Sequence, residues 1–391
     1  MSMGRTVILD GARTPFGKFG GSLRSLSAGM LGGEAIKGAL RKTEVDVDTV
    51  EEVIMGNVLQ GGQGQLPSRQ AARHADIPWE AETETINKVC ASGMRSLTMA
   101  DQIIRSGDKR VIVAGGMESM SNAPYIVPKA RWGAKMGHTD LSDMMIVDGL
   151  TCSFRGVHMG IYGGNAAKEM NISREMQDEW AVRSQKRAGK AKEEGYWAEE
   201  ITPVQVTLPK GDTQVVTNDE TIRENTTIEA LQTLKPAFSK DGTITAGNAP
   251  GVNDGACAMV LMDEKQAGKR PLAVIIGHTA LAMEAEDFPK TPGLVINKLL
   301  KKTGKTAAEI DLFEINEAFS AVALASSQLT GIDIEKINVN GGAVALGHPI
   351  GASGARIILT LAYELRRRGG GTGIAAICSG GGQGDAVMIE V

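Results

Sequence analysis

Two cysteines and one histidine of this chain have surroundings in which their side chains could do covalent chemistry. His348 lies in residues 338–356, a stretch that contains Gly341, Gly342, Gly347, Gly351 and Gly354 and then continues into a helix-like apolar pattern. Glycine at this density indicates that the backbone passes close to another group, which we interpret as a ligand. A tight strand-to-helix crossing with His348 as a core residue would explain the same glycines, so this stretch alone leaves both possibilities open.

Cys90 follows a short apolar segment and precedes a helix that we expect over roughly residues 93–105. The positive end of a helix dipole favours a thiolate over a thiol and lowers the cysteine pKa. The sequence therefore predicts that Cys90 is a nucleophile. The alternative is a buried and unreactive thiol, which is the commoner fate of a single free cysteine.

Cys378 ends a short apolar strand and is separated from three glycines by one serine. In parallel α/β folds, ligands bind at the ends of strands. The glycine amides behind the thiol could donate hydrogen bonds to a developing oxyanion. We expect Cys378 to reach a substrate.

An internal duplication predicts how these residues come together. Residues 35–56 align without gaps with residues 295–316 at an offset of 260, and 92–95 align with 353–356 at an offset of 261. Each copy continues into a short buried strand that ends in glycine, at 110–116 and 373–380. The pattern predicts a duplicated α/β unit with mostly parallel sheets and two halves that meet about a pseudo-twofold. The reactive residues and Asn316 would then come from matching positions of the two halves.

Residues from about 119 to 248 have no counterpart in this repeat. We therefore predict an N-terminal half at 1–118, an inserted loop domain at 119–249 that covers the ligand, and a C-terminal half at 250–391. Long insertions of this kind are usually functional. The insertion holds one strong helix, expected from Ser173, which caps it, to about Glu194.

The composition is that of an ordinary globular protein, with 42% apolar residues and a net charge of −4. We expect no attraction to nucleic acid or to anionic membranes. Residues 1–10 lack the apolar core of a secretory signal, and no apolar run is long enough to span a membrane, so we expect a soluble, cytoplasmic protein. Four cysteines lack metal-binding spacing, so we expect free thiols and no metal site.

Five motifs resemble the thiolase family, in its acetyl-CoA acetyltransferase branch, over essentially the full length. These are NKVCASGMRS at 87–96, GGMESM at 115–120, NEAF at 316–319, NGGAVALGHPIG at 340–351 and CSGGGQG at 378–384. The resemblance implies a five-layered αβαβα fold with an inserted loop domain, and a homotetramer built as a dimer of dimers. It also implies Claisen condensation of two acetyl-CoA to acetoacetyl-CoA and CoA, with the reverse thiolysis, and no permanently bound cofactor.

The resemblance assigns roles to the matching residues. Cys90 would accept the acyl group after deprotonation by His348, and Cys378 would remove the α-proton of the second acetyl-CoA. His348 and a water on Asn316 would form one oxyanion hole. The amides of Cys90 and Gly380 would form another.

Further positions resemble the coenzyme A contacts of the family. Arg223 would meet the nucleotide end, although a solvated surface arginine is nearly as plausible from the sequence. Pro250 replaces a serine that touches pantetheine in many thiolases, and Phe288 replaces a methionine of the acyl pocket, so the preferred acyl length stays open. The other expected contacts are Leu150, His158, Met159, Ala246, Ala318 and Phe319.

Four alternatives to an acetyl-CoA acetyltransferase remain at this point. A broader 3-ketoacyl-CoA thiolase of fatty acid degradation would use the same residues. A ketoacyl synthase acting on carrier-protein thioesters usually pairs one cysteine with two histidines, whereas here the third position is Cys378. A hydrolase based on Cys90 and His348 would leave Cys378 without a role. A catalytically idle carrier or scaffold would not need all of these positions filled.

Overall fold

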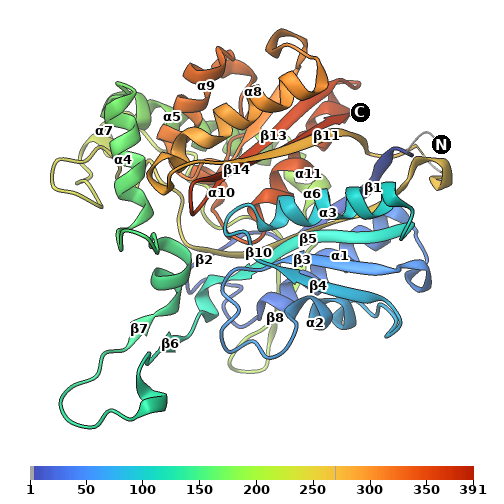
Figure 1. Cartoon of the computed structure of the whole chain (residues 1–391), viewed down its shortest axis with the longest axis horizontal. Coiled ribbons are helices and arrows are strands. Elements are labelled where there is room, and N and C mark those ends of the chain that lie inside the picture. Colours follow the sequence, from blue (N-terminus) through green and yellow to red (C-terminus); the bar gives the residue numbers. More distant parts are fainter. Residues whose placement is uncertain (1–3, 269) are drawn as a thin grey trace.

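The computed structural model describes residues 4–268 and 270–391, and Figure 1 shows the whole chain. Residues 1–3, at the start of the segment predicted to lack a secretory signal, lie outside the described residues. The main sheet has the order β12-β13-β14-β11-β1-β10-β5-β3-β4, with β2 paired to β10. Its strands are β1 Thr6–Arg13, β2 Gly17–Lys18, β3 Glu52–Gly56, β4 Glu82–Ile86, β5 Val111–Ser119, β10 Asn253–Asp263, β11 Ala273–Ala282, β12 Leu312–Ile315, β13 Thr372–Ser379 and β14 Gln383–Glu390.

Apart from the edge strand β4, the strand order is symmetrical about the contact between β1 and β11, which pair over only two residues of each strand. On either side the same sequence of partners follows: β10, β5 and β3 in the N-terminal part, and β14, β13 and β12 in the C-terminal part. The duplicated α/β unit predicted from the repeat is therefore confirmed. Each half contributes its own sheet, and the two sheets join at their inner edges.

Helices lie on both outer faces and between the two sheets, which gives the predicted five layers (Figure 1). Helices α3 and α11 pack against each other in the middle layer, where α3 contacts β5 and β3 and α11 contacts β13 and β12. One outer face is covered by α1 and α2, and the other by α8 and α9. These helices are α1 Ala28–Thr43, α2 Pro67–His74, α3 Ser92–Ser106, α8 Thr291–Thr303, α9 Ser320–Thr330 and α11 Ser353–Arg367.

The prediction of mostly parallel sheets is wrong. Among the strands of residues 4–268 and 270–391, only the pairs β3–β4, β3–β5 and β12–β13 are parallel, whereas β10 runs antiparallel to β1 and β5, and β14 to β11 and β13. Strand β14 runs antiparallel to β13 because a short turn from Ser379 to Gln383 connects the two strands, and a short turn reverses the chain direction. Strand β10 places residues 253–263 in the sheet that also holds β1 and β5.

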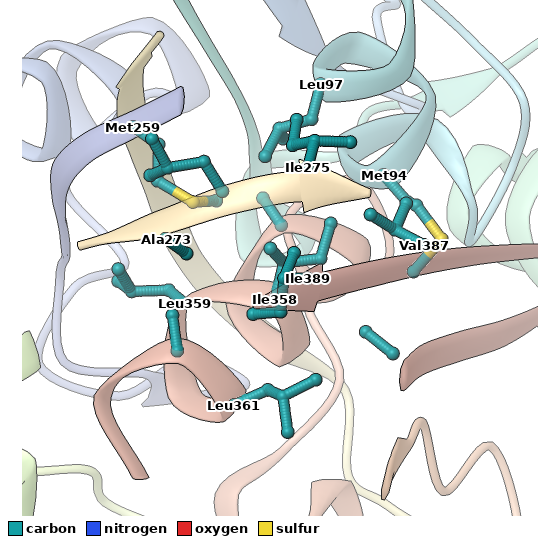
Figure 2. Packing of buried hydrophobic residues seen from close by; sticks show 14 of the residues in the cluster. Met94, Leu97, Met259, Ala273, Ile275, Ile358, Leu359, Leu361, Val387 and Ile389 are labelled. Atoms are coloured by element: carbon teal, nitrogen blue, oxygen red, sulfur yellow. The ribbon is translucent and has the colours of Figure 1, made fainter. Parts of the chain in front are cut away.

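The middle layer holds a shared hydrophobic core (Figure 2). Met94 and Leu97 of α3 and Ile358 of α11 are fully buried in one cluster with residues from both sheets, such as Met259 and Val387. Because removing a large side chain from such a core typically costs 2–5 kcal/mol, this cluster holds the two halves in a fixed relation. The segments that precede α3 and α11, which carry Cys90 and His348, are fixed with it.

Residues 119–249 form the irregular part of the chain. As predicted, Ser173 caps a long helix, α5, through its hydroxyl, which accepts from the Met176 amide at 3.2 Å. An arm with strands β6 and β7 projects from the body (Figure 1). The division at residues 118 and 249 stays a prediction. The elements here are β6 Tyr125–Ile126, β7 Ser142–Asp143, α4 Met159–Glu169, α5 Arg174–Glu193, α6 Tyr196–Glu200, β8 Val204–Thr207, β9 Thr213–Val216 and α7 Ile228–Gln232.

Among the helices of the described residues, none combines the length and apolar character that crossing a membrane requires.

Candidate active site

A cavity of about 330 Å³ opens where the loops before α3, α9 and α11 meet the insertion. Cys90, His348 and Gly380 all line it, although the first two are 258 positions apart in the sequence. Its walls are mostly apolar. Seven of the nine predicted coenzyme A contacts also line it: Leu150, His158, Met159, Pro250, Phe288, Ala318 and Phe319.

Cys90 lies two residues before α3, as the sequence predicts, but its pKa moves in the opposite direction to the prediction. Burial raises the pKa of the thiol to about 12, and the charge of Glu118 adds to the rise. The backbone amides of Gly380 and of Cys90 itself hydrogen bond to the sulfur and lower the pKa, but by less. Loss of solvation thus outweighs the helix end, because charge is expensive in an apolar pocket. The free thiol is protonated at neutral pH.

His348 lies in a buried loop after α10, Ala343–Leu346, and its backbone amide donates to Asn253 Oδ1 at 2.9 Å. Its Nδ1 lies 2.6 Å from Ser353 Oγ, and that hydroxyl donates to the Pro349 carbonyl at 3.0 Å. Because a serine hydroxyl has one hydrogen, its oxygen must accept from Nδ1–H. The Nε2 atom of His348 is therefore an unprotonated acceptor.

This Nε2 atom is buried and has no hydrogen-bond partner among the described residues. Burial, with a smaller effect from the charge of Arg356, lowers the pKa of His348 to about 3. In the free site the imidazole is therefore neutral. A neutral base faces the same cavity as the Cys90 thiol, and it can take a proton from a group that enters that cavity.

Cys378 is the last residue but one of β13 and is fully buried. Its thiol lies close enough to Cys90 for a charge on Cys90 to raise its pKa, although burial has the larger effect. The segments of the two thiols, 288 positions apart, are in contact, because the Ser379 hydroxyl donates to the Lys88 carbonyl at 2.5 Å. Cys378 itself does not line the cavity, but Gly380, two residues later, does. Neither thiol carries a disulfide bond.

Asn316 follows β12 and is fully buried. Both polar atoms of its side chain lack a partner among the described residues, although its backbone amide donates to the Ala376 carbonyl at 2.9 Å. A buried amide without partners is costly. Its side chain therefore retains hydrogen-bonding capacity for a water or a substrate.

Two buried carboxylates hold the loops of the site together, and the sequence analysis assigned neither. Glu118 Oε2 accepts from the amides of Val58 at 3.1 Å and Gly351 at 2.9 Å, and Oε1 accepts from Leu59 at 3.1 Å. This ties the His348 loop to the loop after β3. Burial raises the pKa of Glu118 to about 7.

Glu317 ties the insertion to the same region. Its carboxylate accepts from Trp180 Nε1 at 3.0 Å and Ser184 Oγ at 2.8 Å, both on α5. It also accepts from Asn338 Nδ2 at 2.8 Å and from the Val344 amide at 2.9 Å. Helix α5 is therefore anchored behind the glycine-rich stretch that carries His348.

These two carboxylates and Ser353 lie inside the motifs at 115–120, 316–319 and 353–356, or directly beside them. The sequence signal for these residues was a polar side chain inside a motif of the site. This position indicated a role in the site, but it could not show which groups each side chain would bind.

The other two predicted contacts, Arg223 and Ala246, do not line the main cavity. They line an adjoining depression that shares Ala249 and Gly251 with it. The two hollows thus adjoin each other, one lined by Cys90 and the other by Arg223. A long ligand with a negatively charged end could extend from one into the other.

No group of three metal-ligating side chains that could hold an ion occurs within residues 4–268 and 270–391.

Comparisons with known proteins agree with this architecture. The thiolase N-terminal domain model matches residues 6–265, and the thiolase C-terminal domain model matches residues 269–391. The chain is 48% identical over 387 residues to a probable acetyl-CoA acetyltransferase of Mycolicibacterium smegmatis, covering 98% of this chain and 100% of the relative. It is 47% identical over 387 residues to the acetyl-CoA acetyltransferase of Cupriavidus necator, covering 98% of both.

A probable acetyl-CoA acyltransferase of Staphylococcus epidermidis is 45% identical over 391 residues, which is 99% of both chains. The family models together span almost the whole chain, and the relatives cover it end to end. The chain therefore belongs to the thiolase family.

Proposed function

We propose that this chain is an acetyl-CoA C-acetyltransferase that condenses two acetyl-CoA to acetoacetyl-CoA and CoA and catalyses the reverse thiolysis. The observation that carries the proposal is the convergence of Cys90, His348 and Gly380 on one cavity, with the segment of Cys378 hydrogen bonded to that of Cys90 through Ser379 and Lys88. Relatives 47% and 48% identical that are named acetyl-CoA acetyltransferases support the substrate. Coenzyme A enters and leaves as substrate and product, with no permanently bound cofactor.

The first half-reaction transfers an acetyl group to Cys90. His348 Nε2 takes the thiol proton while the sulfur attacks the thioester carbonyl, so that a free thiolate need not exist in the apolar pocket. The tetrahedral intermediate collapses, the bond from the carbonyl to the CoA sulfur breaks, and the protonated His348 gives its proton to the CoA sulfur. The products are acetyl-Cys90, a neutral His348 and free CoA, while Cys378 keeps its proton.

The second half-reaction forms the carbon–carbon bond. His348 Nε2 takes the Cys378 proton while the Cys378 sulfur removes the α-proton of a second acetyl-CoA. The resulting enolate attacks the acetyl carbonyl on Cys90. Acetoacetyl-CoA forms and the Cys90 sulfur leaves with the bonding electrons. It then recovers its proton from His348, so both thiols and the imidazole return to their starting states.

Two sets of donors would stabilise the developing negative charge. The amides of Cys90 and Gly380 point at the Cys90 sulfur in the free protein, where an oxyanion of the acetylated cysteine would lie nearby. Protonated His348 and a water held by the unpartnered Asn316 amide would serve the enolate oxygen. Each such donor typically lowers the barrier by about 3 kcal/mol.

The coenzyme A moiety would lie along the path between the two hollows. Its pantetheine arm would contact His158, Met159 and Ala318, and its phosphorylated nucleotide end would reach Arg223, whose guanidinium suits phosphate.

We also propose that the chain assembles as a homotetramer, a dimer of dimers, and acts in the cytoplasm. The projecting arm carries strongly exposed apolar side chains, of which Trp132 is 78% exposed and Met136 is 97% exposed. Exposed apolar groups in one segment mark a contact surface. All four cysteines are free thiols, as a reducing compartment keeps them.

The test is a comparison of Cys90→Ala with Cys378→Ala. Cys90→Ala should not incorporate radiolabelled acetyl from acetyl-CoA into the protein. Cys378→Ala should still become labelled but should produce no acetoacetyl-CoA. Normal condensation by Cys378→Ala would refute the role given to the second thiol, and labelled Cys90→Ala would refute the nucleophile.

A further inference from the structure

A second hollow, of about 260 Å³, lies behind the catalytic cavity. Most residues around it are exposed, including Phe154, Arg155, Glu284 and Glu286, so it opens to solvent. Tyr162 is the exception, because this residue is only 4% exposed while it lines the hollow. The floor of the hollow is therefore formed by the Tyr162 ring.

On the other side of this floor lies a wall of the catalytic cavity. The Phe288 ring lines that cavity and is 3% exposed, and its centroid lies 6.4 Å from that of Tyr162 at an interplanar angle of 58°. The backbone also lies between the two hollows, since Gly380 lines the cavity and the next residue, Gly381, lines the second hollow. Two aromatic rings and one peptide step thus separate the hollows.

Further contacts hold the Tyr162 and Phe288 rings in place. The Tyr162 hydroxyl donates to Cys152 Sγ at 3.2 Å, and Cys152 is itself buried. The Phe288 ring also packs edge-on against Phe319, with centroids 6.5 Å apart. The rings cannot turn aside without losing these contacts.

We propose that Phe288 and Tyr162 form a partition that restricts this enzyme to short acyl chains, and that the second hollow is the blocked continuation of the acyl path. This inference rests on the proposed function, and it names the substrate class. An acyl group on Cys90 that grows beyond a few carbons meets the Phe288 ring. The partition therefore favours acetoacetyl-CoA over longer 3-ketoacyl-CoA and disfavours the broader thiolase of fatty acid degradation.

The experiment measures kcat/KM for thiolysis of acetoacetyl-, 3-ketohexanoyl- and 3-ketooctanoyl-CoA. The wild-type protein is compared with Phe288→Ala, Phe288→Leu, Tyr162→Ala and the double variant Phe288→Ala/Tyr162→Ala. Tyr162→Phe is the matched control, since it removes the bond to Cys152 but keeps the ring. Circular dichroism and thermal melting establish that each variant folds, and Phe288→Leu keeps a large apolar side chain should the alanine variants not fold.

The wild-type protein should prefer acetoacetyl-CoA. The ratio of kcat/KM for the eight-carbon to the four-carbon substrate should rise about 10- to 100-fold in the double variant, since a few methylenes in an apolar pocket are worth about that much. Phe288→Leu should raise the ratio for the six-carbon substrate, and Tyr162→Phe should leave all ratios within about threefold of the wild-type values.

Two results would overturn the partition: a wild-type protein that cleaves all three substrates equally well, or folded variants in which no ratio moves. A wild-type protein that cleaves no 3-ketoacyl-CoA at all would instead refute the proposed function.

Discussion

Replacing Ser353 with alanine should lower kcat while KM for the substrates changes little. The Ser353 hydroxyl accepts from His348 Nδ1 at 2.6 Å and donates to the Pro349 carbonyl at 3.0 Å. It therefore selects the tautomer whose Nε2 can take the Cys90 proton. Ser353 is fully buried and does not line the cavity, so the change leaves substrate contacts in place.

The magnitude follows from what the alanine variant leaves unpaired. The Nδ1–H group would lose its partner in a buried site, which costs about 1–3 kcal/mol. The ring can avoid this cost by placing its proton on Nε2, and that tautomer cannot accept the thiol proton. An active tautomer disfavoured by this amount corresponds to about a 5- to 150-fold loss of kcat.

The assay is steady-state thiolysis of acetoacetyl-CoA, with kcat and KM measured separately across pH. Ser326→Ala is the matched control, since it also removes a fully buried serine hydroxyl, which donates to the Val322 carbonyl at 2.7 Å on α9. Ser353→Thr keeps a hydroxyl and should recover part of the activity. A kcat of Ser353→Ala within twofold of the wild-type value, in a folded protein, would refute the reasoning.

Two further predictions concern buried titratable groups. The rate of Cys90 alkylation by iodoacetamide in the ligand-free protein should keep rising with pH beyond 9, because burial raises the thiol pKa to about 12, and a plateau near pH 8.5 in peptide mass spectrometry would contradict this. Glu118 has a folded pKa of about 7 against an ordinary value of 4.5, so the stability that its raised pKa provides is complete below pH 4.5 and is lost as pH rises through 7. We expect the free energy of unfolding in urea to fall by a few kcal/mol more for the wild-type protein than for Glu118→Gln over this pH range. If the two proteins show parallel dependence on pH, Glu118 does not titrate there.

Much of the site was predictable because it is encoded in local pattern. The glycine-rich stretch around His348, the strand before Cys378 and the start of α3 after Cys90 all depend on residues within a few positions of each other. The duplication then showed that these segments occupy matching places, which is why residues 288 positions apart could be expected to meet. The Ser173 cap of α5 was predictable for the same local reason.

The protonation states and the partners of these residues were decided only by the tertiary structure. A helix end near Cys90 is a local feature that favours a lower pKa, but burial by residues from distant segments raises the pKa of this thiol to about 12. Likewise, the direction of β10 and the three amides that converge on Glu118 depend on segments that are remote in sequence. The sequence alone indicated which side chains could carry the proposed chemistry and which elements hold them, because those are short-range properties. The solvation of a side chain and its hydrogen-bond partners depend on segments from the whole chain, so only the folded structure specifies them.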